Sequence, residues 1–362
     1  MTLIADFKVH GLPIMVGDIL LTAEKTTRSG VSVRLPLVGD INELYATQAL
    51  PLEASVTQKI NILHDRLIVA WAGPLKAADK VLRALDQTCQ KKNFSAKDMA
   101  NAINAIKPSK ISGLALVGFV LEDRDKGYEA LHFQLGAKAQ TINPFGQVFF
   151  AGSGQRLFLE CLGRVGQQTD RWGHIPRTTL PRAMSAALTT QLTGHEISDG
   201  SNLLDRWGGG FEAAYWAGGK FVKLGNRLHT FWTARQSGAD WHLTMKPWFY
   251  KVDYWEKYLV VRSLSAEPVD GRHIVRSDEL HIVSPTLLRN KKIDLAKMPK
   301  PIFEHEILSC HVKLLEGDDF SLAHANSEQL IYLEEAGDFL HLRISDRLIR
   351  MLVERMQHRP GA

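Results

Sequence analysis

Residues 2–18 read TLIADFKVHGLPIMVGD, two short apolar runs separated by His10-Gly11. A glycine-containing pair between two apolar runs is typical of a tight turn, because glycine adopts positive φ without steric cost. The stretch therefore predicts a β-hairpin that ends at Gly17-Asp18 and indicates a sheet-based fold.

A second hairpin is predicted over residues 59–73, KINILHDRLIVAWAG. Its second run is almost continuously apolar, which is typical of a strand buried on both faces. After Pro74 the apolar residues recur at helical spacing over 74–92, and Ser95 is placed to cap another helix over 95–106. Two helices therefore follow the second hairpin.

The same alternation continues along the chain. Strands and helices are predicted, in order, as strands over 112–123, 128–142 and 146–154, helices over 155–165 and 180–196, and glycine-separated strands over 207–234. This order indicates a layered α/β (α+β) domain over residues 1–235, in which paired helices pack on sheets. Residues 25–57 lack sustained periodicity and are interpreted as an insertion or long loop. Residues 236–362 are interpreted as a β-rich C-terminal extension or small domain.

Composition and charge limit the functional classes. Of 362 residues, 45% are hydrophobic and 23% are charged, as in an ordinary globular protein. The net charge is +5, without a run of about five like charges, so neither nucleic acid nor a membrane is expected as a partner. No apolar stretch approaches the roughly 18 residues of a membrane span. Three scattered cysteines argue against a disulfide framework and favour a reducing, cytoplasmic location.

Several short motifs follow one another in a recognisable order. Gly152-Ser153-Gly154 ends a strand and opens a helix, and Asp205 precedes Gly208-Gly209-Gly210 and the closing strands. Together with the opening hairpin and with Lys59 before the second hairpin, this order resembles the proteasome β-subunit family over residues 2–223. The resemblance is strongest to the simple bacterial HslV-type peptidase. It implies the four-layer αββα sandwich of the N-terminal-nucleophile (Ntn) hydrolases, two antiparallel sheets between two helix layers.

In this family the mature chain begins with a nucleophilic threonine, so the resemblance assigns that role to Thr2 once Met1 is removed. The Thr2 hydroxyl would attack a carbonyl, and its own freed α-amine would take the proton. An α-amine titrates near about pH 7.7–8.0, close to the working pH of a general base. An internal threonine cannot act in this way, because its nitrogen is an amide.

The resemblance also assigns roles to five further residues. Lys59 would lower the proton affinity of the nucleophile through its positive charge, and Asp18 would pair with Lys59 and hold it in place. The backbone N–H of Gly73 would donate to the oxyanion. Ser153 and Asp205 would orient the terminal amine.

Each of these positions also has a structural interpretation or a competitor. Asp18 can accept N–H bonds at the end of a strand, and Ser153 can cap the helix that follows it. Lys25 competes with Lys59, because the segment before Lys59 is longer than the family's equivalent. Gly208 stands where the family has a serine and removes one hydroxyl that would orient the amine.

Two other groups of residues suggest chemistry less clearly. Six of the eight tryptophans lie between Trp207 and Trp255, as an aromatic-packed β core or as a subunit interface or ligand platform. Residues 303–312, FEHEILSCHV, bring together Glu304, His305, Glu306, Cys310 and His311. Alternation along a strand would scatter these side chains over both faces, so neither a metal site nor another cofactor is predicted.

The favoured hypothesis is a cytoplasmic threonine-type peptidase or amidohydrolase that cuts a peptide or protein substrate. A noncatalytic proteasome-like scaffold and an Ntn amidase acting on a small molecule are the alternatives. The resemblance implies a homo-oligomer, and ring, dimer and monomer stay open. It also implies a separate ATPase partner, because the sequence contains no Walker-type loop.

Overall fold

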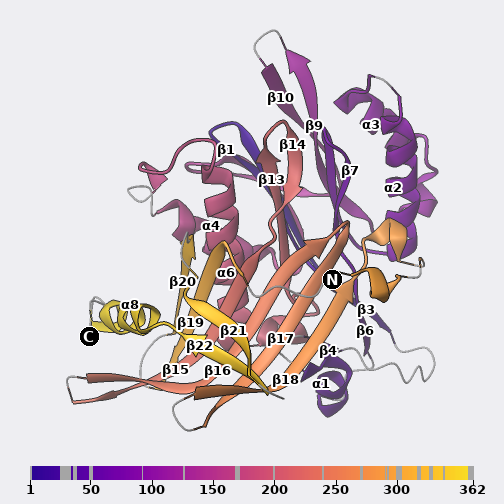
Figure 1. Cartoon of the computed structure of the whole chain (residues 1–362). Coiled ribbons are helices and arrows are strands. Elements are labelled where there is room, and N and C mark those ends of the chain that lie inside the picture. The colour runs from indigo at the N-terminus through magenta and orange to yellow at the C-terminus, as the bar shows by residue number, and fades with distance from the viewer. Residues whose placement is uncertain are drawn as a thin grey trace. The chain divides into compact units, whose positions relative to one another are not determined.

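The structure is a computed structural model. It describes residues 2–24, 34–35, 39–48, 52–91, 93–124, 127–167, 172–198, 200–238, 240–269, 272–289, 291, 293–298, 304–315, 319–325, 329–336 and 339–357. This part of the chain is a mixed α+β protein made mostly of strands, with seven helices and several antiparallel sheets (Figure 1). It divides into two compact units, Met1–Leu224 with Val283–Ile293 (unit 1) and Gly225–Ile282 with Asp294–Ala362 (unit 2).

Unit 1 contains a six-stranded antiparallel sheet. Its strands, in spatial order, are β11 (Lys138–Ile142), β12 (Gly146–Gly152), β1 (Leu3–Val9), β2 (Leu12–Asp18), β13 (Phe211–Ala217) and β14 (Lys220–Lys223). The predicted opening hairpin is confirmed as β1 and β2, which pair from Ile4–Gly17 to Val9–Leu12. His10 and Gly11 both have positive φ at the turn between them.

A second antiparallel sheet of four strands belongs to the same unit. In spatial order these are β10 (Gly127–Leu135), β9 (Ala115–Arg124), β8 (Leu67–Ala72) and β7 (Ile60–His64). Every residue of β8 is buried, and alternate residues face opposite sides. Ile68 and Ala70 join a core with Ile4 and Met15 of the six-stranded sheet. The two sheets therefore pack face to face.

Helices cover the outer faces of these two sheets. Val69 and Trp71 of β8 pack in one cluster with residues of α2 (Leu75–Cys89) and α3 (Ala96–Asn104), which lie beside the four-stranded sheet (Figure 1). α4 (Gln155–Gly166) contacts β1 and β12, and α6 (Leu180–Ser198) contacts β2 and β13. A 3₁₀ turn (Pro108–Lys110) precedes β9, and the short α7 (Ser201–Leu204) follows α6.

The segment interpreted as an insertion or long loop contains regular structure where it is described. Its elements and the strand before it are β3 (Leu20–Glu24), β4 (Arg34–Leu35), β5 (Gly39–Asp40), α1 (Ile41–Thr47) and β6 (Leu52–Val56). β6 pairs with β3. Leu20, Ile41, Tyr45 and Leu52 form a small core with Leu203. Residues 25–33, which include Lys25, and residues 36–38 and 49–51 lie outside the described residues.

A later segment of the chain also belongs to unit 1. Gln58 forms a parallel bridge with Pro285 and donates to the Val283 carbonyl at 2.8 Å. The indole N–H of Trp71 donates to Thr286 Oγ1 at 2.9 Å, within the 3₁₀ turn Thr286–Leu288. Val283, Pro285 and Thr286 are thus joined to Gln58, just before β7, and to β8, although they lie more than 200 positions away in the sequence.

Unit 2 is an eight-stranded sheet that curls into a half-barrel. In spatial order its strands are β20 (Phe320–Ala325), β19 (Ile307–Leu314), β15 (Arg227–Ser237), β16 (Asp240–Trp255), β17 (Tyr258–Val269), β18 (Arg272–Val283), β22 (Phe339–Ile344) and β21 (Ile331–Ala336). β15 and β19 run parallel, and the other described pairs run antiparallel. The predicted domain boundary at residue 235 falls within β15.

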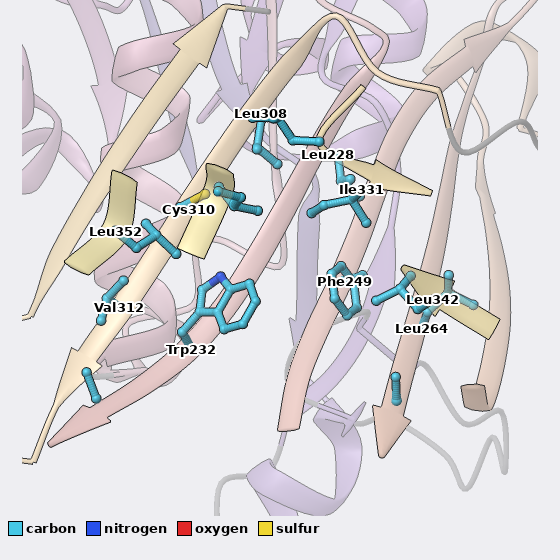
Figure 2. Packing of buried hydrophobic residues seen from close by; sticks show 14 of the residues in the cluster. Leu228, Trp232, Phe249, Leu264, Leu308, Cys310, Val312, Ile331, Leu342 and Leu352 are labelled. Atoms are coloured by element: carbon cyan, nitrogen blue, oxygen red, sulfur yellow. The ribbon is translucent and has the colours of Figure 1, made fainter. Parts of the chain in front are cut away.

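The apolar core of unit 2 lies between this sheet and α8 (Asp346–Gln357). Leu348, Leu352 and Met356 recur at helical spacing and are buried, so one face of α8 packs on the sheet. Figure 2 shows Trp232 and Phe249 in this core. Trp232 is only 3% exposed, as the aromatic-core interpretation of the tryptophan-rich segment expects. No helix in the described ranges combines the length and apolar character needed to span a membrane.

Candidate active site

Thr2, Asp18 and Lys59 converge inside unit 1. Thr2 directly precedes β1, Asp18 is the last residue of β2, and Lys59 directly precedes β7. Their exposed fractions are 2%, 0% and 0%. Because β1 and β2 belong to one sheet and β7 to the other, the face-to-face packing of the sheets creates the cluster.

The Lys59 ammonium is at the centre of the hydrogen bonds. Its Nζ donates to Thr2 Oγ1, to Asp18 Oδ1 and, at 2.6 Å, to the Leu20 carbonyl. An ammonium has three protons to donate, and these three acceptors match that number. The Leu20 carbonyl is placed for this bond because the chain turns from β2 into β3 at Asp18.

Asp18 joins the nucleophile candidate to the lysine. Its Oδ1 accepts from the Thr2 hydroxyl at 2.5 Å and from the backbone N–H of Leu3 at 3.0 Å. Its Oδ2 accepts from the backbone N–H of Gly208 at 2.7 Å. The Thr2 hydroxyl therefore accepts from Lys59 and donates to Asp18 in a closed triangle.

Burial lowers the pKa of Lys59, and the negative charges of Asp18 and Glu212 oppose that shift only in part. Because desolvation penalises the charged form of a lysine, the proton of this ammonium is more easily given up than that of an exposed lysine. While it is charged, this ammonium lowers the proton affinity of the adjacent Thr2 hydroxyl.

Two glycines enclose the backbone of Thr2. Gly152, with φ of 103°, pairs with Leu3, and a Cβ at this position would lie 1.8 Å from the Thr2 carbonyl oxygen. The N–H of Gly154 donates to the same carbonyl at 3.3 Å. The Gly-Ser-Gly sequence therefore has a steric reason at its first glycine, since any side chain there would displace Thr2.

Ser153 and Asp205 are brought together, through the backbone of Asp205. Ser153 Oγ donates to the Asp205 carbonyl at 3.0 Å. The residue at the N-cap of α4 is Gly154, with no side-chain capping bond, so the interpretation of Ser153 as a helix cap is wrong. Among the described residues, no hydrogen bond joins Ser153 or Asp205 to Thr2, and their role in orienting the Thr2 amine stays a prediction.

Gly73 is positioned by a different contact. It follows β8 with φ of 115°, and a Cβ here would lie 2.2 Å from the Gly113 carbonyl oxygen. Glycine is therefore required at this position by backbone packing between β8 and the approach to β9. The oxyanion role assigned to its N–H stays a prediction.

The structure adds a buried carboxylate that sequence reasoning missed. Glu196, on α6, accepts from Asn202 Nδ2 at 2.7 Å and from the N–H of Gly209 at 2.8 Å. Burial, as the largest cause, raises its pKa to about 7. A Cβ at Gly208 would lie 2.1 Å from Glu196 Oε2. Glu196 therefore occupies the space that a side chain at residue 208 would need, and nothing in the local sequence of α6 indicates this.

A second missed carboxylate is Glu212 on β13, which is also fully buried. It accepts from the backbone N–H groups of Lys59 and Ile60 and forms an ion pair with Lys223. Glu212 lies in a predicted strand, but its contact with Lys59 joins residues that are 153 positions apart.

The other titratable segment does not form a comparable cluster. Glu304 and Glu306 are exposed, whereas His305, Cys310 and His311 are buried. Within the described residues, no group of three His, Cys, Asp or Glu side chains is placed to hold a metal ion.

Neither a protein-family model nor a curated protein matches the sequence. The function is therefore inferred from the geometry of the Thr2–Asp18–Lys59 cluster and from the residues that hold it.

Proposed function

We propose that unit 1 is a proteasome-like Ntn-hydrolase domain that cleaves peptide or amide bonds with Thr2 as its nucleophile. One observation carries this proposal. Lys59, fully buried, donates at once to the Thr2 hydroxyl, to Asp18 and to the Leu20 carbonyl. Buried lysines are costly to keep, and this one is directed at the hydroxyl of a residue at the start of the first strand.

The arrangement of the layers supports the same proposal. Helices α4 and α6, the six-stranded sheet, the four-stranded sheet, and helices α2 and α3 follow one another across unit 1. This is the order of layers that the αββα sandwich implied by the resemblance to Ntn hydrolases would have.

The proposed reaction requires cleavage of the bond before Thr2, because only then is the Thr2 nitrogen an amine. The amine takes the hydroxyl proton as Oγ1 attacks the substrate carbonyl, and the positive charge of Lys59 favours loss of that proton from Oγ1. The negative charge then develops on the carbonyl oxygen of the substrate. The amine then returns the proton to the leaving nitrogen as the C–N bond breaks. Water, activated by the same amine, hydrolyses the acyl ester on Thr2 and releases the acid.

The experiment that tests this is labelling of the purified protein with an electrophilic β-lactone, followed by peptide mapping. The intact mass is measured first, to establish that Thr2 is N-terminal. We expect a single adduct on Thr2, no adduct in Thr2→Ala, and retained labelling in Thr2→Ser, which keeps a hydroxyl. Peptide hydrolysis by Thr2→Ala at the parent rate would refute the proposal.

The burial of Thr2 favours a second candidate, a noncatalytic scaffold with the same fold. At 2% exposure the hydroxyl is closed to solvent in this conformation. A protein with Thr2 at its N-terminus that resists the β-lactone at every pH would establish the scaffold. Labelling of Thr2 together with failure to cut a peptide library would instead indicate a small-molecule amide as substrate.

A further inference from the structure

Glu212 is a buried carboxylate that binds the backbone of Lys59. Its Oε1 accepts from the N–H of Lys59 at 2.6 Å and from the N–H of Ile60 at 2.8 Å. Glu212 lies on β13 of the six-stranded sheet, whereas these two amides lie at the start of β7 in the four-stranded sheet. One carboxylate oxygen thus links the two sheets at the residue that carries the site's ammonium.

Lys223 provides the counter-charge for Glu212. Its Nζ forms an ion pair with Glu212 Oε2 and donates to the Ile60 carbonyl at 2.6 Å and to Gln58 Oε1 at 3.3 Å. A carboxylate buried without such a partner would be strongly destabilising. Gln58 and Ile60, which Lys223 contacts, are the neighbours of Lys59 in the chain. The ion pair therefore lies against the backbone of Lys59.

The strand register brings Glu212 close to Asp18. In the pairing of β13 with β2, Phe211 lies opposite Asp18 and Glu212 lies opposite Gly17. Asp18 and Glu212 therefore come from adjacent positions of neighbouring strands. Asp18 holds the ammonium of Lys59, and Glu212 holds its backbone.

We propose that Glu212, with Lys223 as its counter-ion, is a positioning residue that fixes the Lys59 backbone so that the ammonium reaches Thr2 and Asp18. Its catalytic consequence rests on the proposed function, whereas its structural consequence does not. Glu212 makes no described hydrogen bond to the Thr2 hydroxyl, so it acts through Lys59.

The test compares two double variants that both lack the ion pair. Glu212→Gln with Lys223→Met keeps an acceptor oxygen for the two amides, whereas Glu212→Leu with Lys223→Met removes it. The readouts are the rate of Thr2 labelling by the β-lactone and hydrogen exchange at the amides of Lys59 and Ile60. Asp6→Asn is the matched control, because Asp6 is a fully buried carboxylate of β1 that faces His132 rather than Lys59.

We expect the Gln/Met variant to label within about threefold of the parent and the Leu/Met variant to label at least about tenfold more slowly, since small displacements in a catalytic cluster are costly. The Lys59 and Ile60 amides should exchange faster only in the Leu/Met variant. The control should label at the parent rate. Equal labelling of the two folded double variants would overturn the proposal.

Two provisions keep the outcome decisive. If the Leu/Met variant does not fold, Glu212→Asp replaces it, because the shorter side chain keeps the charge but withdraws the acceptor from the Lys59 amide, and the same slow labelling is expected. If the parent protein is not labelled at Thr2, the proposed function fails by itself. Hydrogen exchange at Lys59 and Ile60 then decides the positioning role, and unchanged exchange in the Leu/Met variant overturns it.

Discussion

Asp18 and Glu196 are held by neighbouring amides of a single turn. The N–H of Gly208 donates to Asp18 Oδ2 at 2.7 Å, and the N–H of Gly209 donates to Glu196 Oε2 at 2.8 Å. Burial is the largest cause that raises the pKa of Glu196, and the negative charge of Asp18 raises it further, against the opposing hydrogen bonds from Asn202 and Gly209. The turn at Gly208-Gly209 therefore couples Asp18, which contacts Thr2, to Glu196, which does not.

The raised pKa of Glu196 predicts a pH-dependent contribution of this residue to stability. Its pKa is about 7 in the folded protein against an ordinary value of 4.5. A carboxyl whose pKa is raised by folding stabilises the protein fully below about pH 4.5, and that stabilisation is lost as the pH rises through about 7. Between pH 4.5 and 8 the titration of Glu196 should lower the free energy of unfolding by at most about 3 kcal/mol.

Urea unfolding of the parent and of Glu196→Gln across that pH range measures this loss. The variant should gain stability relative to the parent as the pH rises, because its residue 196 does not titrate. Stability curves that run parallel from pH 4.5 to 8 would show that Glu196 titrates equally in both states.

Gly208→Ala should damage the site itself. The new Cβ would lie 2.1 Å from Glu196 Oε2 and 2.2 Å from Asn202 Nδ2, on a residue with φ of 107°. Backbone strain alone costs about 1–3 kcal/mol, and the displaced turn would withdraw the Gly208 N–H from Asp18. We expect lower stability and slower β-lactone labelling of Thr2.

The matched control for this variant is Gly127→Ala. Gly127 has φ of 123°, but a Cβ there meets nothing within 4 Å. Gly127→Ala should be destabilised by the backbone strain alone, and its Thr2 should be labelled at the parent rate. Equal labelling losses in the two variants would contradict the account of Gly208.

The parts of the fold that the sequence predicts are those with local causes. The β1–β2 hairpin follows from a turn between two apolar runs. The start of α3 follows from Ser95, whose hydroxyl accepts from the Asp98 N–H at 3.2 Å in a capping box. The double burial of β8 follows from its continuous apolar run, since alternate residues face the two cores.

The parts that could not be predicted depend on contacts between distant segments. β6 pairs with β3 across a segment with no periodicity. Thr286 bonds to Trp71 although the two residues are 215 positions apart in the sequence. The cluster of Thr2, Asp18 and Lys59 was predicted through a resemblance. The carboxylates of Glu196 and Glu212 that hold it are indistinguishable, in sequence, from ordinary charged residues of a helix and a strand.

Asp6 predicts a second stability effect away from the site. Burial raises its pKa from 3.8 to about 6, against the opposing influence of His132, whose Nε2 lies 3.2 Å from Asp6 Oδ2. Its stabilising contribution is therefore complete below about pH 3.8 and is lost as the pH rises through about 6. Asp6→Asn should accordingly be more stable than the parent at pH 8, by up to about 3 kcal/mol.

Chemical denaturation at pH 8 checks this, with Asp123→Asn as the control. Asp123 forms an ion pair with Arg66 at 3.0 Å, but its side chain is 72% exposed. Loss of such a surface pair should change stability by no more than about 1 kcal/mol. An Asp6→Asn protein that is less stable than the parent at pH 8 would show that the ionised form of Asp6 stabilises the folded protein.

The core of unit 2 should depend on α8. Leu352 is fully buried in the cluster that Figure 2 shows, together with Trp232 and Phe249. Leu352→Ala removes buried methyl groups and leaves a cavity, which costs about 2–5 kcal/mol in such a core. The control is Arg350→Ala, because Arg350 lies on the exposed face of the same helix. This variant should change stability by no more than about 0.5 kcal/mol. Hydrogen exchange at the β16 amides is the suitable measurement, because it reports the local stability of this sheet. The exchange should accelerate in Leu352→Ala alone, and equal acceleration in both variants would mean that α8 stabilises the sheet by some means other than its apolar face.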